Sequence, residues 1–584
     1  MKKNIILAVS LLGICVAASA QKITVKDTTF TTYGFSDPNP IPLIGNIYPY
    51  HKFESFALEP EQQEWKMVVL ENKWLRIKIL PEIGGKIWSV YDKVRGKELF
   101  YDNKVVKFRE ISLRGPWTSG GIEFNYGIIG HAPSCAHPVD WSTEYKSDGS
   151  VSCYIGVLEL LTRTTWTVEI NLPADAVWLR TRSFWHNSSG EFQPYYTWAN
   201  SGVDASDDLE ILYPGTYTIG HDGQTTPFPI DECGRDLSKY SEQAFGLDKS
   251  FHPGGSHKGY FGAYWRNADF GMLHYALRDE KLGRKYFSWT QSPQGEIWKG
   301  ILTDDNPQYV ELQSGRLFNQ NLLNSVETPF KQTVFTPYGT DEWNEYWMPF
   351  AGTGGVSEVD LNVVVNVGES GIAIFPLRHI KGEMKILDAK GSEISSLSVD
   401  LRASEPFRCV IPAGTRAGQI VLNGRRIWSA EKDEISRPHT INTDFSLESP
   451  QGLVAYAEYL YGMRYFREAE EKVNQALVSE PSLAPALRLK AQLQLRSAEY
   501  EQAFETTDKL LAIDEYDAKA NYIRGMAALN LGRKYDAMDA FEIAAITSEL
   551  RSASQLQLAR IHFADGNPEL AAEYANRIIR IRDG

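Results

Sequence analysis

The stretch W-L-R-I-K-I-L, residues 74–80, alternates apolar and polar side chains and is followed by a proline. The stretch T-W-T-V-E-I-N-L, residues 165–172, repeats this alternation. Such a pattern is typical of strands that bury one face. Similar segments recur between residues 74 and 350, a span too long for a small sandwich. We therefore predict a large antiparallel assembly of two sheets over this region.

A second β-rich segment follows the first. The stretches V-D-L-N-V-V-V-N-V (359–367) and Q-I-V-L (419–422) have strand-like apolar runs, which predict a smaller sandwich over residues 351–430. Residues 431–450 are rich in Ser, Thr and charged side chains and contain Pro438 and Pro450. We interpret them as a linker.

After residue 450 the pattern becomes helical and a repeat appears. Small residues recur every 34 positions in two parallel series: Ala469, Ala503, Ala537 and Ala571, and Ala457, Ala491, Gly525 and Ala559. Small side chains at fixed points let paired helices approach closely. Residues 451–584 resemble about four tetratricopeptide repeats. This resemblance implies a concave surface that docks a peptide, a protein partner or another face of the same chain.

The charge and aromatic content narrow the choice of partner. The 584 residues include 60 Lys and Arg against 74 Asp and Glu, a net charge of −14. This acidity disfavours nucleic acid and anionic lipid surfaces. The 15 Trp, 29 Tyr and 26 Phe would suit the flat faces of sugar rings, although a plain β-sheet core also accounts for most of them.

The start of the chain predicts export. Lys2 and Lys3 precede an apolar run from Ile5 to Val16 and the small residues Ala18-Ser19-Ala20, a pattern typical of a cleavable signal peptide. We expect a periplasmic or secreted protein that begins near Gln21, with no membrane span. Four later cysteines allow three full disulfide pairings, and free buried thiols are an equal alternative: Cys135, Cys153, Cys233 and Cys409. Their spacing predicts no metal site, and no cofactor motif is present.

The densest group of chemically useful side chains lies between residues 81 and 140. It comprises P-E-I-G-G-K-I-W (81–88), R-G-P-W-T-S-G-G-I-E-F-N-Y-G (114–127) and G-H-A-P-S-C-A-H-P-V-D (130–140). Arg, Glu, Asn and His are side chains that hold sugar hydroxyls and move protons at an anomeric centre. The candidates here are Arg114, Trp117, Glu123, Asn125 and His131. A structural role for the histidine is the alternative.

A second group follows in Y-V-E-L-Q-S-G (309–315) and D-E-W-N-E-Y-W-M-P (341–349). In a strand, Glu311 and Gln313 would point to the same face, where a carboxylate and an amide can share one substrate. Glu342 beside Trp343 is a further acid in an aromatic setting. A solvated acidic turn beside core tryptophans is the alternative.

These motifs resemble a known family. G-G-K-I, the G-H turn and the late E-L-Q strand look like the galactose-mutarotase superfamily, whose fold is a large antiparallel β-supersandwich. W-x-S-G-G-I-E-F-N, G-H-x-P, P-Y-Y-x-W-A-N (194–200) and Y-x-E-L-Q-x-G are more closely similar to the bacterial family named domain of unknown function 5107. That resemblance covers roughly residues 40–350 and implies a β domain followed by tetratricopeptide repeats. We expect a signal peptide (1–20), a supersandwich (21–350), a small sandwich (351–430), a linker (431–450) and the repeats (451–584).

The resemblance also implies site residues. In mutarotases a late-strand Glu is the general base, and Glu311 falls at that point. The histidine that serves as their general acid has no clear match, because residues 195–200 carry Tyr196, Trp198 and Asn200 instead. His131 could supply the proton from another turn. The resemblance implies a carbohydrate ligand.

We therefore expect an exported carbohydrate-active enzyme that acts at an anomeric centre. Glu311 would be base or nucleophile with Glu123 or His131 as partner, and the other residues would hold the sugar: Arg114, Trp117, Asn125, Trp198, Asn200, Gln313, Glu342 and Trp343. Glycoside hydrolysis is favoured over mutarotase-like epimerisation, and a non-catalytic glycan-binding protein docked through its repeats is the third alternative. The enzymatic hypotheses require the turn of His131 and the strand of Glu311 to face each other across one aromatic-walled hollow.

Overall fold

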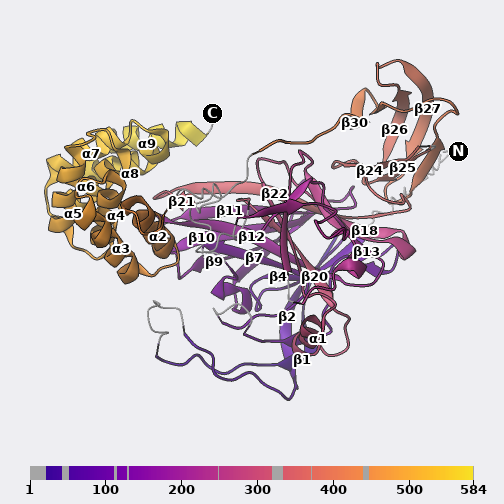
Figure 1. Cartoon of the computed structure of the whole chain (residues 1–584), viewed down its shortest axis with the longest axis horizontal. Helices are drawn as coiled ribbons and strands as arrows, with labels where there is room; N and C mark the ends of the chain where they lie inside the picture. Colours follow the sequence, from indigo (N-terminus) through magenta and orange to yellow (C-terminus); the bar gives the residue numbers. More distant parts are fainter. Residues whose placement is uncertain are drawn as a thin grey trace, which may run out of the picture.

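The computed structural model describes residues 21–41, 51–110, 115–127, 130–221, 223–246, 249–318, 333–369, 371–437 and 446–582. The predicted signal peptide, Arg114 and the middle of the predicted linker lie outside these ranges. Figure 1 shows a β region, a smaller β unit at one end and a helical region at the other.

The largest element among the described residues is a 14-stranded sheet. Its strand order, with bounds, is β15 (Thr225–Pro227), β14 (Tyr217–Ile219), β16 (Lys249–Gly254), β19 (Gly283–Ser288), β20 (Tyr309–Gly315), β12 (Gln193–Asp204), β7 (Ile122–Gly127), β4 (Lys86–Asp92), β3 (Leu75–Leu80), β2 (Glu61–Glu71), β1 (Lys22–Tyr33) and β6 (Val105–Lys107). In addition, β21 (Thr333–Phe335) pairs with β12, and β5 (Lys97–Glu98) pairs with β4.

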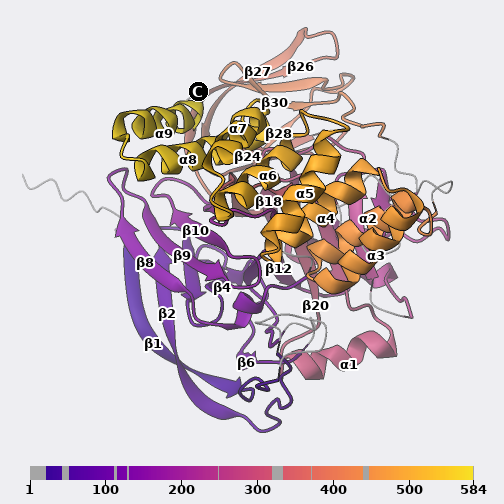
Figure 2. The same ribbon diagram turned by 90° about the vertical axis from the view of Figure 1, so that its left-hand side faces the viewer.

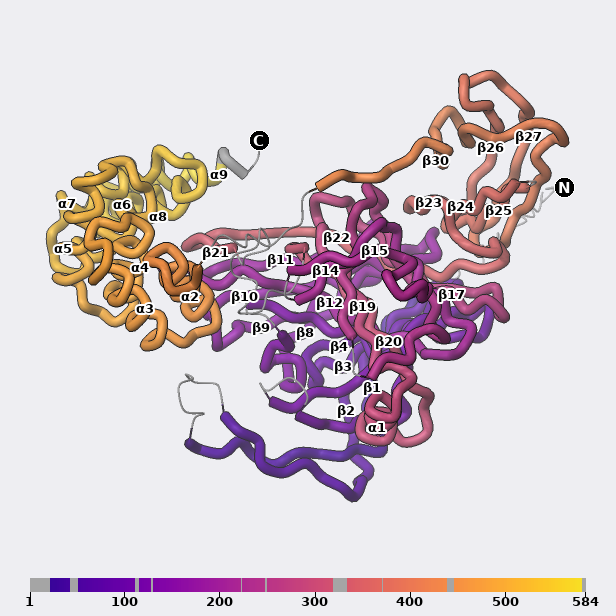
Figure 3. Tube along the Cα trace, viewed as in Figure 1, coloured from indigo at the N-terminus to yellow at the C-terminus, as the bar shows by residue number. Residues whose placement is uncertain are grey.

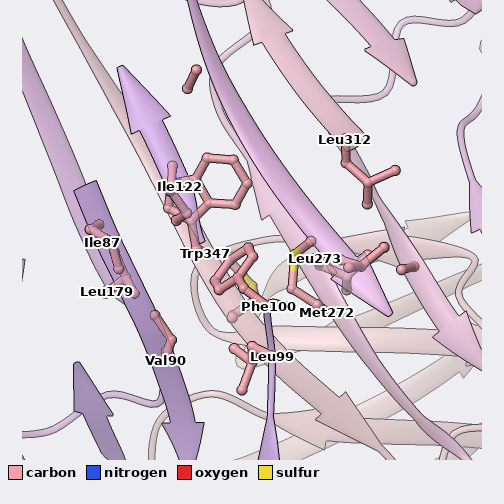
Figure 4. Packing of buried hydrophobic residues seen from close by; sticks show 14 of the residues in the cluster. Ile87, Val90, Leu99, Phe100, Ile122, Leu179, Met272, Leu273, Leu312 and Trp347 are labelled. Carbon is pink, nitrogen blue, oxygen red and sulfur yellow. The ribbon is translucent and has the colours of Figure 1, made fainter. Parts of the chain in front are cut away.

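An eight-stranded sheet packs against one face of the large sheet. Its order is β13 (Leu209–Leu212), β17 (Tyr260–Trp265), β18 (Phe270–Tyr275), β22 (Thr340–Ala351), β11 (Leu179–Asn187), β10 (Thr164–Leu172), β9 (Val151–Glu159) and β8 (Asp140–Tyr145). Figure 4 shows side chains from both sheets meeting in the core between them, among them Ile87, Ile122, Leu273 and Trp347. The predicted large two-sheet assembly is confirmed.

The opposite, outer face of the large sheet carries a second aromatic cluster. Trp88, Trp117, Tyr101 and Tyr309 belong to it, and the helix α1 (Pro293–Leu302) adds Trp298. Figure 3 shows α1 beside β20 and β1. Because strand alternation sends neighbouring residues to opposite faces, the large sheet has apolar cover on both sides. A polar group on its outer face is therefore conspicuous.

Residues 358–429 form the smaller sandwich. One four-stranded sheet has the order β23 (Glu358–Val359), β24 (Val363–Val367), β25 (Gly371–Pro376) and β28 (Phe407–Val410). The other has the order β27 (Glu393–Leu401), β26 (Ile380–Leu387), β29 (Gln419–Leu422) and β30 (Arg425–Ser429). A separate apolar core that includes Val365, Ile374 and Ile420 joins them, as predicted.

The C-terminal region consists of four helix pairs among the described residues: α2 (Pro450–Gly462) with α3 (Phe466–Ser479), α4 (Ala484–Arg496) with α5 (Tyr500–Leu511), α6 (Ala518–Asn530) with α7 (Lys534–Ala544), and α8 (Ser548–Ala564) with α9 (Pro568–Arg582). Ala469, Ala503 and Ala537 of the 34-residue series are fully buried between helices. The predicted tetratricopeptide-repeat solenoid is confirmed. In the described part of the chain, the helices all fall short of the length and apolar character that crossing a membrane requires.

The first helix of each pair faces the β region, and the two regions are held together by side chains (Figures 1 and 2). Arg464, after α2, is almost fully buried and donates to Gln193 and to the carbonyl oxygen of Leu161 at 3.1 Å. Arg496 pairs with Glu191 at 2.7 Å. Phe192 inserts among the helices and lies 6.0 Å from the Tyr522 ring. Part of the repeat surface is thus occupied by this same chain, one of the expected modes of docking.

The four cysteines after residue 20 are free thiols, so none of the three pairings forms. Cys135 and Cys153 are buried.

Candidate functional site

A row of polar side chains crosses four neighbouring strands of the large sheet. Glu123 on β7 pairs with Asn200 on β12, Asn200 pairs with Gln313 on β20, and Gln313 pairs with Lys285 on β19. Residues directly opposite one another in antiparallel strands project from the same face. Ile122, next to Glu123, belongs to the core between the sheets. The polar row therefore lies on the outer face of the large sheet.

Glu123 is 2% exposed and is surrounded by donors. Its carboxylate accepts from Trp117 Nε1 at 2.6 Å and from Asn125 Nδ2 at 2.8 Å, and Lys86 Nζ lies 3.5 Å away. His131 Nδ1 lies 2.6 Å from Oε1. Burial would raise the pKa of Glu123, but the charges of His131 and Lys86 and the hydrogen bonds lower it to about 2. Glu123 therefore stays ionised.

The turn that carries His131 is fixed from several sides. Asn125 Oδ1 accepts from the Ala132 N–H at 2.6 Å, and Trp198 Nε1 donates to the carbonyl oxygen of Gly130 at 3.1 Å. The His131 ring lies edge-on between Trp117, at 5.3 Å, and Trp198, at 4.9 Å. Because a carboxylate can only accept, the Nδ1 atom carries the proton in this contact. The Nε2 atom has no hydrogen-bond partner within the described ranges, and the side chain is 15% exposed.

Glu311 lies on the same face of the sheet as the His131 turn. Its carboxylate accepts from Gln313 Nε2 at 2.8 Å and from the Tyr309 hydroxyl at 3.1 Å. Glu311 and Gln313 thus point to one face, as the alternation predicted. The Glu311 residue is 5% exposed. It is therefore held in place by two neutral donors, in contrast to the charged partners of Glu123.

The register sets the separation of the two carboxylates. Glu311 is two strands and two positions away from Glu123, which corresponds to roughly 12 Å between the Cα atoms. Asn200 and Gly202 lie between them on β12, and Trp198 lies one row farther from Glu311. Asn200 Oδ1 is buried and finds no hydrogen-bond partner among the residues described. Buried acceptors are normally paired, so a ligand hydroxyl at this point would meet an available acceptor.

A hollow opens beside Trp198 on this face. Its walls include Trp198, Tyr196, Lys285 and Gln313. Gly283 and Gly315, which face each other on β19 and β20, also line it, and their lack of side chains leaves the space. Neither His131 nor Glu311 is among the described residues that line this hollow. Two residues of its wall reach them: Trp198 contacts the His131 ring, and Gln313 donates to Glu311.

Two predicted site residues lie elsewhere, and their grouping with the others was wrong. Glu342 and Trp343 belong to β22 in the eight-stranded sheet. Strand alternation sends Trp343 into the core, where it is 1% exposed, and sends Glu342 outward to pair with Arg182 at 2.5 Å. Trp117 is buried behind His131 and supports Glu123, so it offers no open face to a sugar.

Sequence reasoning missed two lysines. Lys86 stands in the quoted G-G-K-I segment but was not selected. It is 1% exposed and donates to the carbonyl oxygen of Thr118 at 2.5 Å. Lys285 joins the polar row only through the pairing of β19 with β20. No local sequence pattern assigns either lysine to the site, because their positions in it depend on the pairing of strands that are far apart in the sequence.

Comparisons with known proteins bear on the whole chain. A family model described as "Domain of unknown function (DUF5107)" matches residues 42–350. A tetratricopeptide-domain protein from Parabacteroides distasonis is 18% identical, with 95% of this chain and 92% of that chain covered and a TM-score of 0.52. This likeness shows a shared fold over the β and helical regions.

Two further solved structures are similar to part of the chain. A putative aldose 1-epimerase from Klebsiella pneumoniae is 10% identical, with 49% of this chain and 80% of that chain covered and a TM-score of 0.34. A galactose mutarotase-like protein from Lactobacillus casei is 11% identical, with 49% of this chain and 100% of that chain covered and a TM-score of 0.34.

Proposed function

Because this chain belongs to the DUF5107 family, a domain of unknown function, we propose its activity from the site itself: proton transfer at the anomeric centre of a sugar. His131 and Glu311 are the acid–base pair. The observation that carries this proposal is that Glu123 holds His131 Nδ1 at 2.6 Å while Glu311 lies on the same face of the sheet, two strands away from Glu123.

A sugar suits the walls of the hollow. Trp198 and Tyr196 supply aromatic surface for the C–H faces of a ring, and Gln313 and Lys285 supply donors and acceptors for its hydroxyls. Asn200 lies next to Gln313 in the same polar row. A mostly apolar cavity with a few convergent polar groups is the usual form of a small-molecule site.

The acid–base chemistry follows from the two environments. Protonated His131 donates from Nε2 to the ring oxygen as the bond between that oxygen and the anomeric carbon breaks. Glu311 removes the proton from the anomeric hydroxyl, and the open-chain aldehyde forms. After rotation of the aldehyde, Glu311 returns its proton to the carbonyl oxygen and His131 takes back the other as the ring closes. Ionised Glu123 stabilises the imidazolium and orients its ring.

This arrangement supports anomer interconversion better than hydrolysis by two carboxylates. A hydrolase of that kind needs one carboxyl group that is protonated before the reaction. Glu123 cannot take this role because four donors surround it and its pKa is lowered to about 2. His131 is then the acid, and it replaces the missing mid-domain histidine of the mutarotase pattern.

The proposal is tested with the chain from Gln21 to its end and a panel of free aldoses. NMR exchange spectroscopy would measure the interconversion of anomers, and a reducing-end assay on matched glycosides would detect cleavage. We expect faster anomer exchange with at least one aldose, loss of that rate in Glu311→Gln and no loss in Glu342→Gln. The control removes an exposed carboxylate of the other sheet. Sugar binding without turnover in the wild-type chain would instead identify a non-catalytic glycan-binding protein.

A further inference from the structure

A cationic recess adjoins the hollow. A second cavity shares His252, Arg284 and Phe318 with it and is also lined by Arg278 and Arg437. Lys285 lines the first of the two cavities. Within the described ranges, no Asp or Glu lines either cavity. This is a local reversal of charge in a chain whose net charge is −14.

The three arginines are held in place without a carboxylate. Arg278 Nη1 donates to the carbonyl oxygen of Ser256 at 2.9 Å, and Arg284 Nη2 donates to that of Lys258. The Arg437 guanidinium lies 4.8 Å from the Phe318 ring centre. None of the three forms an ion pair with another described residue.

Burial makes this arrangement costly. Arg284 is 6% exposed, and its burial, with the charge of Arg278, lowers its pKa to about 10. Burial also lowers the pKa of Arg278. Asp433 lies nearby and favours both cations, but its carboxylate already accepts from the Ser256 hydroxyl and from the His257 N–H at 3.0 Å. Neighbouring buried cations without a paired carboxylate are strongly unfavourable unless an anion joins them.

Guanidinium groups suit one ligand chemistry above others. Their planar donors bind carboxylate, sulfate and phosphate oxygens in pairs, and such charge-assisted bonds are about twice as strong as neutral ones. The recess adjoins the hollow at His252, Arg284 and Phe318, which line both cavities. A sugar bound in the hollow would therefore have substituents next to Arg284 and the recess.

We propose that the sugar bound by this protein carries an anionic substituent, and that Arg278, Arg284 and Arg437 bind it. The class is a uronic acid, through its carboxylate, or a sulfated sugar, through its ester. This inference rests on the proposed function, since the same hollow holds the sugar ring.

Titration calorimetry on the chain from Gln21 with matched sugars tests the inference. Galactose is compared with galacturonic acid and with galactose 6-sulfate, and glucose with glucuronic acid. We expect at least one acidic sugar to bind about tenfold or more tightly than its neutral partner, since charge-assisted hydrogen bonds are about twice as strong as neutral ones. Whether the carboxylate or the sulfate gives the larger gain identifies the substituent.

Two arginine variants complete the test. Arg437→Gln changes an exposed side chain at the mouth of the recess, and Arg278→Gln changes a half-buried one. Both should reduce the preference for the acidic sugar while affinity for the neutral sugar is kept, and Arg467→Gln on the exposed face of α3 should change neither affinity. Equal affinity for neutral and acidic sugars would overturn the inference and leave the proposed function standing. Failure of every sugar to bind would overturn both, whereas acid-selective binding without anomer exchange would contradict only the acid–base proposal.

Discussion

His131 Nδ1 and Glu123 Oε1 lie 2.6 Å apart, so a buried carboxylate sets the orientation of a partly exposed imidazole. The contact joins strand β7 to the turn that follows it. Lys86 on β4 and Trp117 complete the surroundings of the carboxylate. The Glu123 carboxylate thus joins several elements, so the contribution of this contact to the free energy of unfolding can be measured.

Acid should weaken this contact. The pKa of Glu123 in the folded chain, about 2, lies below the ordinary value of 4.5, so the stabilisation is complete above pH 4.5 and is lost as pH falls toward 2. The shift corresponds to roughly 3 kcal/mol. Buried Glu345 acts in the same direction. Burial raises its pKa, but Lys281 and His274 lower it to about 2. Denaturant unfolding followed between these pH values should show the loss, and Glu123→Gln should reduce its size. A pH-independent midpoint would refute this assignment.

Removing the buried lysine should destabilise the β region. Lys86→Met leaves Glu123 with one cation fewer in a nearly dry setting, and breaking a buried ion pair costs about 3–5 kcal/mol. Lys73→Met, on the exposed turn before β3, should change the free energy of unfolding by less than about 0.5 kcal/mol. Urea titration of the first unfolding transition compares them. The double variant Lys86→Met, Glu123→Gln should lose less than the sum of the two single changes.

Filling the hollow should block the ligand without unfolding the chain. A Cβ atom at Gly315 would meet nothing closer than 3.5 Å, so Gly315→Ala should keep its melting temperature while its side chain enters the space beside Trp198. We expect sugar affinity to fall, and Gly300→Ala on α1, where a Cβ atom meets open space, serves as the control. Unchanged affinity in calorimetry would show that the ligand does not use this hollow.

The helical region should support the site. Met463 packs against Tyr196 and Trp198, and its neighbour Arg464 is bonded to Gln193 on β12. Arg464→Leu should loosen this contact and speed hydrogen exchange over residues 193–198, with weaker sugar binding. Arg467→Leu, on the exposed face of α3, should have little effect. If exchange in β12 stayed as slow in Arg464→Leu as in the wild type, the helices would have no part in holding the site.

Local sequence patterns were sufficient for much of the fold. The alternation of apolar and polar residues at 74–80 predicted β3, because the apolar side chains there are buried and the polar ones are half-exposed. The 34-residue spacing identified the helix pairs, whose small residues are buried between helices.

The site was only partly predictable. Glu123, Asn125 and His131 are close in sequence and could be grouped from it, whereas Lys285 meets Gln313 only through non-local strand pairing. Glu342 and Trp343 were misgrouped because a dense aromatic and acidic stretch in one strand divides between the core and the opposite surface.

The most direct test of the account is the rate of anomer exchange in two histidine variants of the same turn. His131→Asn should lose roughly 10²- to 10⁴-fold in rate, the contribution typical of general acid–base catalysis, while its sugar affinity stays near that of the wild type. Its melting temperature should fall, because the contact with Glu123 is lost. His137→Asn, an exposed neighbour on that turn, should retain the rate. An exchange rate in His131→Asn equal to that of the wild type would contradict the assignment of His131 as the acid.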